Sequence, residues 1–153
     1  MLRLSKMADY GIVLMNYIAG SQQEERPNAR SLSALSGLPL PTVSKVLKSY
    51  SRAGLLIAHR GQRGGYTLAK TPEQISVADM IAAIDGPIGL TDCSKHAPGL
   101  CDIENTCPVR NNWGVITRTV HDALDQLSLA QMSQQTPCAS TPASQPRLEL
   151  VRS

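Results

Sequence analysis

Glycine and proline divide the N-terminal half of the chain into short segments, and this division limits the folds that it can form. Gly37 and Gly54 each follow an apolar-periodic stretch, and Pro39 and Pro41 form a tight connector between two such stretches. Since glycine commonly ends a helix and proline suits a helix start, the pattern predicts three short helices. The glycine-rich segment 61–65 then separates two apolar runs, which predicts a hairpin.

The spacing of apolar residues sets the expected helix limits. The first helix should begin after Ser5, which can serve as its N-cap, and run to about Ala19. The second helix should cover about residues 29–36, and the third should start near Thr42. In the third helix apolar residues recur at i, i+3, i+4 and i+7, so one face should be core and the other polar and basic. The apolar residues of that helix are Val43, Val46, Leu47 and Tyr50.

Two further helices and a loop are expected beyond the hairpin. Ser76 should cap a fourth helix, and residues 86–109 should form a loop rich in glycine, proline and cysteine. A long helix is expected over 109–132, because its apolar residues recur in steps of three and four and form a seam for another helix. The seam residues are Trp113, Ile116, Val120, Ala123, Leu127 and Ala130. The tail 133–153 has few apolar residues and should be disordered.

The composition favours a helical core. The chain has no Phe, one Trp and four Tyr, so its packing must rest on aliphatic residues and Met. Three helices followed by a two-stranded wing make a winged helix-turn-helix. We therefore predict a mostly α fold with a small β wing. Its expected parts are a winged-helix domain (1–70), a linking helix with the cysteine loop (71–108), the long C-terminal helix (109–132) and the tail (133–153).

The sequence gives no sign of export or membrane insertion. The most apolar early stretch, residues 11–20, is interrupted by Asn16 and is too short to span a bilayer. A signal-peptide cleavage pattern is also lacking. We therefore expect a cytoplasmic protein without membrane association. In a reducing cytoplasm its four cysteines are poor candidates for structural disulfides.

Charge is distributed unevenly along the chain. Residues 1–70 carry ten Lys and Arg against three acids, a net charge of +7, whereas residues 71–153 carry five against nine, a net charge of −4. Neutralising phosphates requires clustered Lys and Arg, so the basic half is the expected contact with a polyanion. A basic surface that is simply solvated is the alternative interpretation.

The third helix and the hairpin together indicate a site for double-stranded DNA. In a winged helix-turn-helix the third helix enters the major groove and the wing lies along the backbone. Near the start of the helix, Thr42, Ser44 and Lys45 should meet base edges. Further along, Lys48 and Arg52 should contact phosphates. At the wing tip, Arg60 and Arg63 should approach a groove. Taken alone, the third helix could equally be an amphipathic surface helix with solvated lysines.

Three cysteines lie within fifteen residues of the predicted loop. Cys93, Cys101 and Cys107 have the spacing C-x7-C-x5-C. Soft thiolates gathered on a loop suit an iron-sulfur cluster or a soft metal. Zinc is a weaker match, because structural zinc sites usually contain a C-x2-4-C pair. Three unrelated surface thiols are the alternative interpretation.

A fourth ligand would be needed to complete such a site. His96 lies within the loop, and Asp9 is an acid midway along an otherwise apolar first helix. Asp9 could equally cap a helix or pair locally, and His96 could simply be solvated. Cys138, in the tail, is expected to be an exposed thiol.

Several motifs together resemble the IscR/NsrR family of winged-helix regulators. They are LRLSKMADYG at 2–11, VSKVLK and AGL within 38–56, and RGQRGGY at 60–66. The resemblance covers about residues 1–132 and is nearest to the regulators of the SUF iron-sulfur assembly operon. It implies a homodimer whose C-terminal helices cross. It also implies a [2Fe–2S] or [4Fe–4S] cluster that is ligated by Cys93, Cys101 and Cys107 and controls DNA affinity.

The sequence departs from the IscR branch at the position of one ligand. Arg110 lies three residues after Cys107, where that branch has a histidine ligand. NsrR-like members instead use an acid from the first helix of the partner subunit, and Asp9 matches that position. The resemblance therefore implies that Asp9 is the fourth ligand.

These observations predict a transcription regulator without catalytic activity. We expect a repressor of iron-sulfur assembly genes that is controlled by its cluster. A nitric-oxide or redox sensor of the same architecture and a cluster-free regulator with metal-binding or oxidant-sensing cysteines remain alternatives. A thiol redox enzyme is disfavoured, because the sequence has no C-x-x-C pair.

Overall fold

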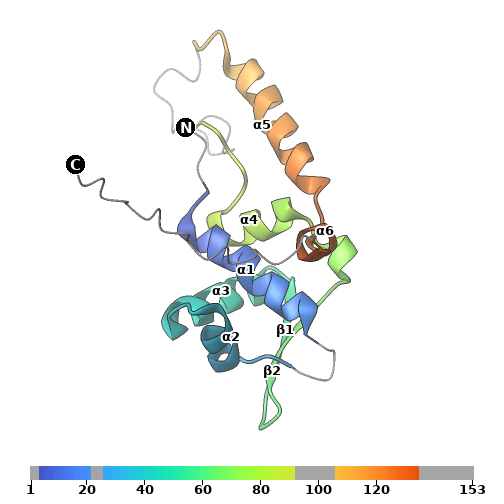
Figure 1. Cartoon of the computed structure of the whole chain (residues 1–153). Helices are drawn as coiled ribbons and strands as arrows, with labels where there is room; N and C mark the ends of the chain where they lie inside the picture. The colour runs from blue at the N-terminus through green and yellow to red at the C-terminus, as the bar shows by residue number, and fades with distance from the viewer. Residues whose placement is uncertain (1–3, 22–25, 92–105, 135–153) are drawn as a thin grey trace, which may run out of the picture.

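The computed structural model describes residues 4–21, 26–91 and 106–134. Its helices and strands form a mostly helical fold with one two-stranded antiparallel sheet, as the sequence predicted (Figure 1). In chain order they are α1 (Lys6–Gly20), α2 (Ala29–Ser36), α3 (Leu40–Arg52), β1 (Leu56–His59), β2 (Gly65–Leu68), the 3-10 turn η1 (Pro72–Gln74), α4 (Val77–Asp85), α5 (Arg110–Asp125) and α6 (Leu129–Gln134). None of the described helices is long and apolar enough to cross a membrane.

Local capping interactions explain the limits of the first two helices, which agree with the prediction to within a residue. The Ser5 hydroxyl accepts a hydrogen bond of 3.0 Å from the Ala8 N–H at the start of α1. Asn28 caps α2 through its side chain, which accepts from the Ser31 N–H at 2.9 Å. Gly37 ends α2 with φ 71°, a left-handed conformation that glycine adopts without steric cost.

Helix α3 begins at Leu40, two residues before the predicted start near Thr42. Pro41 occupies its second position, where the missing N–H costs nothing because the first N–H groups of a helix have no partner within it. The predicted apolar face is confirmed, since its four residues are fully buried: Val43, Val46, Leu47 and Tyr50.

The wing is a short antiparallel hairpin. Leu56 pairs with Leu68 and His59 pairs with Gly65. The turn between the strands closes through a hydrogen bond of 2.9 Å from the Gly64 N–H to the Gly61 carbonyl. Gly61 has φ 104°, which an L side chain would adopt only with strain. The glycine-rich turn therefore projects the wing tip beyond the helices.

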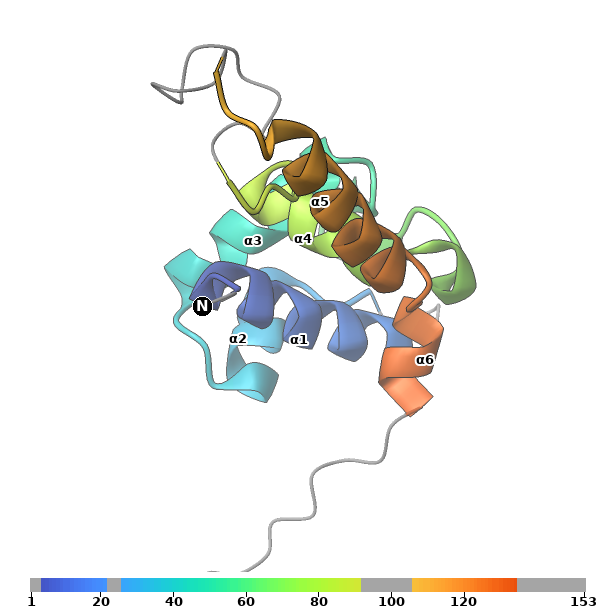
Figure 2. The ribbon, with the colours of Figure 1, turned by 90° about the horizontal axis from the view of Figure 1, so that it is seen from above.

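A single core joins the N-terminal helices to α4 and α6. Helix α4 lies between α5 and the three N-terminal helices (Figures 1 and 2) and contributes Met80 and Ile81 to this core. Ser76 caps α4 as predicted, because its hydroxyl accepts from the Asp79 N–H at 3.0 Å. The fourth helix therefore holds the winged-helix unit together and also supports α5.

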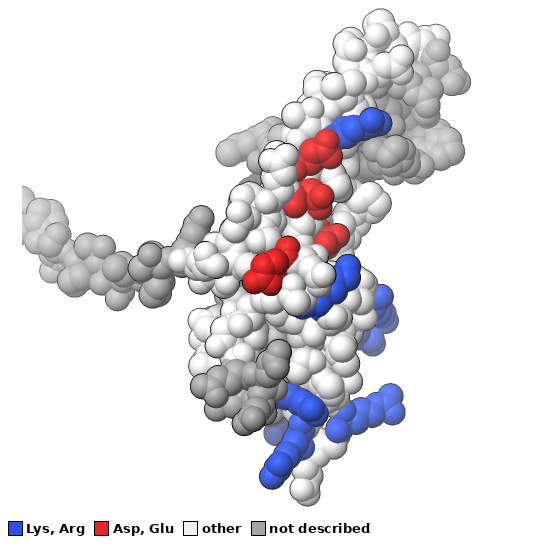
Figure 3. Space-filling view, turned by 90° about the vertical axis from the view of Figure 1, so that its right-hand side faces the viewer, with Lys and Arg blue, Asp and Glu red and all other residues white. Residues whose placement is uncertain are grey.

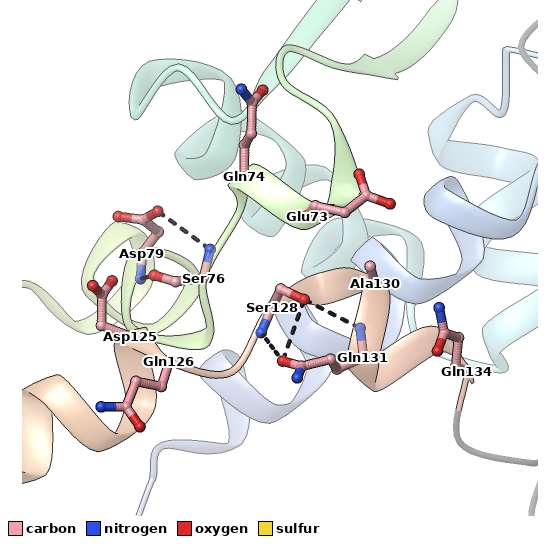
Figure 4. A pocket seen from close by; sticks show the side chains of 10 residues that line it. All are labelled: Glu73, Gln74, Ser76, Asp79, Asp125, Gln126, Ser128, Ala130, Gln131 and Gln134. Atoms are coloured by element: carbon pink, nitrogen blue, oxygen red, sulfur yellow. Dashed lines mark hydrogen bonds between the residues drawn. The ribbon is translucent and has the colours of Figure 1, made fainter.

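The prediction of one long helix over 109–132 is wrong, since α5 ends at Asp125 and a separate helix, α6, starts at Leu129. Figure 4 shows why a new helix begins there. The Gln131 side chain accepts from the Ser128 N–H at 2.8 Å, and the Ser128 hydroxyl accepts from the Gln131 N–H at 3.3 Å. This capping box, with its S-x-x-Q pattern, was the local signal that the seam pattern concealed.

Backbone pairing also holds the break between α5 and α6 in place. The Val77 N–H donates to the Leu127 carbonyl and the Leu129 N–H donates to the Ile75 carbonyl, both at 2.8 Å. Leu129 and Ala130 are consequently buried, and α6 packs against α1. Ala130 therefore belongs to the core of its own chain rather than to a seam for a partner.

Candidate nucleic-acid interface

The polar face of α3 is open to solvent. Its buried face anchors the helix on the core, which fixes the rotation of the helix about its axis. Among the five predicted contact residues of this helix, Thr42 is partly exposed and the others are exposed: Ser44, Lys45, Lys48 and Arg52. The fold thus places all five on the side of α3 that faces away from the core.

Hydroxyl groups in α2 fix the turn that leads into α3. The Ser33 hydroxyl donates to the Leu38 carbonyl at 2.6 Å, and the Leu38 N–H donates to the Ser36 hydroxyl at 3.3 Å. These bonds satisfy backbone groups that a tight turn would otherwise leave without partners. Helices α2 and α3 therefore form a defined helix-turn-helix.

The wing tip presents the other predicted contacts. Arg60 and Arg63 are both exposed, with Gly61 and Gln62 between them. Just before the turn, the His59 Nε2 lies 2.8 Å from the Thr67 hydroxyl on the opposite strand. Arg30, on α2, was given no role from the sequence, because no pattern connects it with the wing; the fold places it beside Arg60 in the lining of one groove.

Charge is segregated in space as well as along the sequence. Figure 3 shows Lys and Arg side chains gathered at the end of the molecule that carries the wing, with Asp and Glu nearer to α5. A polar pocket of about 530 Å³ on the acidic side is lined by η1, α4, α5 and α6, and includes Glu73, Asp79 and Asp125 (Figure 4). This distribution directs the basic end toward a polyanion.

Tyr50 connects α3, the helix with the predicted DNA contacts, with α1 and α4. Its hydroxyl is buried without a hydrogen-bond partner among the described residues. Burial raises the pKa of Tyr50 above its usual range, and the negative charge of Asp85 raises this pKa further. A β-carbon at Gly11 would overlap the Tyr50 hydroxyl, so the glycine lets α3 approach α1.

The structure describes only part of the predicted cluster site. Cys93, Cys101 and His96 lie outside the described residues. Cys107 has a free, partly buried thiol shortly before α5. Within the described residues no three potential ligands converge.

Asp9, the acid in the otherwise apolar first helix, lies on the exposed side of α1. Helix α1 is buried along one face, which contains Gly11, Leu14 and Ile18. The carboxylate thus needs no partner to offset burial. Asp9 and Cys107 are accessible donors, and their carboxylate and thiol chemistry fits an iron-sulfur cluster.

A family model and individual relatives agree on the family of this chain. A family model called Rrf2, described as an iron-dependent transcriptional regulator, matches residues 4–135. A putative HTH-type transcriptional regulator of Mycobacterium tuberculosis strain H37Rv is 28% identical over 138 residues, covering 86% of this chain and 81% of that protein. A putative rrf2-like HTH-type regulator of Rhodobacter capsulatus is 26% identical over 136 residues, covering 84% and 91%.

Solved structures share the fold. CymR, the global cysteine regulator of B. subtilis, superimposes with a TM-score of 0.70 at 25% identity, covering 90% of this chain and 100% of that one. IscR of T. potens gives a TM-score of 0.63 at 25% identity, covering 86% and 85%. The relatives are transcriptional regulators rather than enzymes. The chain is therefore a DNA-binding transcription regulator that belongs to the Rrf2 family, as its resemblance to the IscR/NsrR regulators predicted.

Proposed function

We propose that this regulator is a homodimeric repressor of iron-sulfur assembly genes whose DNA affinity depends on a bound iron-sulfur cluster. The observation that carries the proposal is the pairing of an accessible basic interface, on α3 and the wing, with a three-cysteine segment that directly precedes α5. If the protein has two conformations with different affinities for DNA, a cluster that binds one of them more tightly increases the population of that conformation, to an extent set by the difference between its two binding free energies.

The proposed DNA contacts follow from the position of each side chain. Thr42, Ser44 and Lys45 lie at the start of α3, where a helix in the major groove meets base edges. Further along the same exposed face, Lys48 and Arg52 are positioned for phosphates. At the wing tip Arg60 and Arg63 complete the interface.

Helix α5 supports the proposed homodimer. One side of α5 is partly or fully buried, and its residues recur in steps of four and three: Trp113, Thr117 and Val120. Helix α5 packs on α4. A second row of apolar residues, on α5 and just beyond its two ends, stays exposed: Val109, Ile116, Ala123 and Leu127. Because a row of this kind on a helix is normally covered, a second copy of α5 is its proposed occupant. A two-fold dimer would then present two α3 helices to successive major grooves.

The proposed ligands are Cys93, Cys101, Cys107 and Asp9. Support comes from the clustered thiols, the accessibility of Asp9 and Cys107, and the iron-dependent description of the family. A carboxylate is a harder ligand than a thiolate, so Asp9 would be the labile one. If Asp9 came from the partner subunit, ligation would link the position of α1 to the dimer interface.

Anaerobic purification followed by absorption spectroscopy and by iron and sulfide analysis tests the proposal. We expect coloured protein with acid-labile sulfide. Cys93→Ala, Cys101→Ala and Cys107→Ala should each abolish the colour, whereas the control Cys138→Ala should keep it. Colourless protein with stoichiometric zinc would contradict the proposal. Asp9→Ala should assemble a cluster with a shifted spectrum, whereas His96→Ala should change little.

A cluster-free, thiol-sensing regulator is the second candidate function. The structural similarity to CymR, named as a cysteine regulator, favours it to the same degree as similarity to IscR favours the cluster. In that case metal-free protein should bind DNA, and mild oxidants should alter its affinity through the cysteines. Loss of regulation on iron chelation, with no response of the apo form to oxidants, would exclude this candidate. A response to nitric oxide by the cluster-bound form would instead indicate a nitric-oxide sensor.

A further inference from the structure

A groove of about 510 Å³ lies between the start of α2 and the wing. One wall comes from the first residues of α2 and the other from the strands and turn of the wing. The lining includes Arg30 on the first wall and Arg60 on the second. This groove is separate from the exposed face of α3, since no α3 residue lines it.

Hydrogen bonds join the two walls into one framework. The Tyr66 N–H, on β2, donates to the Pro27 carbonyl at 2.9 Å, immediately before α2. A β-carbon at Gly65 would overlap the Arg26 carbonyl, so the glycine permits this close approach. The reciprocal caps between Asn28 and Ser31, both at 2.9 Å, then fix the start of α2. The backbones that carry Arg30 and Arg60 are thus held in a constant relation.

The charge of the groove is unbalanced. Its lining contains Arg30, Arg60 and His59 but no Asp or Glu. Both arginines are exposed, and within the described residues neither forms an ion pair. Two positive charges that line the same groove favour an anion between them. Arginine also matches phosphate geometry, because its planar group can donate two parallel hydrogen bonds.

The lining of the groove suits an extended polyanion more than a small molecule. Gly61, Gly64 and Gly65 line the wing side, where the absence of side chains lets another backbone approach closely. Arg60 also belongs to the wing tip, so the groove is continuous with the proposed DNA interface. Figure 3 shows that Lys and Arg gather at this end of the molecule.

We propose that the groove between α2 and the wing binds the sugar-phosphate backbone of duplex DNA, with Arg30 and Arg60 on either side of one phosphate. The proposal rests on the DNA-binding function and adds Arg30 to the interface. The contact fixes the height and angle at which α3 enters the adjacent major groove, because α2 and α3 belong to one helix-turn-helix. Arg30 therefore acts on affinity and register and reads no base.

The experiment measures binding of the full chain to a duplex obtained by selection from random sequences, by fluorescence anisotropy at several salt concentrations. Arg30→Ala and Arg60→Ala should each weaken binding and reduce the salt slope by about one unit, the value for one lost phosphate contact. The double variant should also lose about one unit rather than two, since both arginines hold the same phosphate. Lys70→Ala, an exposed residue outside the groove lining, is the control with the same change in charge.

A second measurement locates the contact on the DNA. One neutral methylphosphonate linkage at a time is placed along the selected duplex. At one position in each half of the binding site, the neutral linkage should weaken DNA binding by the wild type and leave DNA binding by Arg30→Ala unchanged. Circular dichroism should give the same melting temperature for all variants, because the exchanged side chains are exposed.

Three outcomes would overturn the proposal. If Arg30→Ala behaves like Lys70→Ala while Lys48→Ala loses affinity and slope, the groove makes no contact although the proposed DNA interface stands. If Arg30→Ala abolishes binding of inorganic phosphate, measured by calorimetry, but leaves DNA affinity unchanged, the groove holds a small anion. If the wild type binds no duplex in any cluster state, the DNA-binding function fails together with the groove.

Discussion

Single residues decide how closely α3 approaches the rest of the molecule. Gly11 on α1 leaves space for the Tyr50 hydroxyl of α3, and Asp85, at the end of α4, raises the pKa of that tyrosine. The Ser5 hydroxyl donates to the Asp85 carboxylate at 2.6 Å, which ties the start of α1 to the end of α4. The segment after Asp85 leads toward the three cysteines. Asp85 is therefore the last residue of α4 before the segment that contains the proposed ligands, and Tyr50 belongs to the helix of the proposed DNA interface.

Replacing Gly11 tests this close packing. Gly11→Ala should destabilise the protein by about 1–3 kcal/mol, because the new methyl group overlaps the Tyr50 hydroxyl in a packed core. Urea unfolding measures the loss. Gly20→Ala is the control, since a β-carbon there meets nothing within 4 Å. Adding Tyr50→Phe to Gly11→Ala should recover part of the loss, and a double variant no more stable than Gly11→Ala would refute the overlap.

Tyr50→Phe alone tests the unpaired hydroxyl. A buried polar group without a hydrogen bond costs about 1–3 kcal/mol, so this variant should be as stable as the wild type at pH 7 or more stable. The folded-state pKa is raised, so the unfolded chain ionises first and wild-type stability should fall as the pH rises above about 10. Urea unfolding across that pH range should give a smaller fall for Tyr50→Phe. Equal falls in both proteins would assign the pH dependence to other groups.

At the scale of elements, the C-terminal helices divide two tasks. Helix α6 completes the core through Leu129, whereas α5 keeps an exposed apolar row beyond that core. Val115 is 66% exposed and Ile116 is 44% exposed, values that leave much apolar surface in water for a single copy of the chain. The break thus separates the helix that completes the core from the helix that carries the proposed dimer contact.

The Ser128 cap can be tested by removing its hydroxyl. Ser128→Ala should lower the free energy of unfolding by about 0.5–2 kcal/mol, because the Gln131 N–H loses its acceptor. Ser133→Ala, further along α6, removes a hydroxyl that donates to the Ala130 carbonyl within the helix and should cost less. Chemical denaturation of both variants gives the comparison. A stability gain for Ser128→Ala would show that one continuous helix is preferred.

The exposed row on α5 makes the proposed dimer testable. Ile116→Glu should convert the protein to monomers, since it places a charge in the centre of an apolar contact. Analytical ultracentrifugation measures the change in mass. Asn111→Glu introduces the same charge at an exposed position outside the row and should leave the dimer intact. A dimeric Ile116→Glu variant would place the interface on another surface.

For the whole molecule, function depends on the separation of charge. Figure 3 shows most of the visible basic side chains toward the wing end and the acidic ones toward α5, so the field favours approach of DNA in one orientation. The acidic side also carries the helix caps formed by Asp79 and Gln131. The arrangement therefore serves stability at one end and association with DNA at the other.

Substitutions on α3 should separate affinity from sequence preference. Lys48→Ala should weaken binding to all duplexes about equally and reduce the salt slope by about one unit, whereas Ser44→Ala should alter the ranking of selected sequences. Binding measurements against a panel of duplexes distinguish the two effects. If both variants left affinity, ranking and slope unchanged, another surface would carry the interface.

The sequence alone was sufficient where the cause of a structure lies within a few residues. Ser5 and Ser76 cap the helices that follow them, as predicted, and Gly37 ends α2 with the positive φ that glycine allows. The apolar spacing of α3 likewise identified its buried face, and hence the polar face proposed to contact DNA. These features depend on hydrogen bonds and steric limits between neighbours in the chain, which a sequence pattern records directly.

The tertiary structure decided the features that depend on contacts between distant segments. The split of the long C-terminal helix combines a local cause, the Ser128 cap, with a tertiary one, the pairing of Leu127 and Leu129 with the backbone around Ile75. The exposure of Asp9 depends on which face of α1 the other helices cover. Arg30 and Arg60, thirty positions apart, share a groove because α2 is joined to the wing. A local pattern cannot specify such contacts, because their free energy comes from surfaces that meet only after the chain has folded.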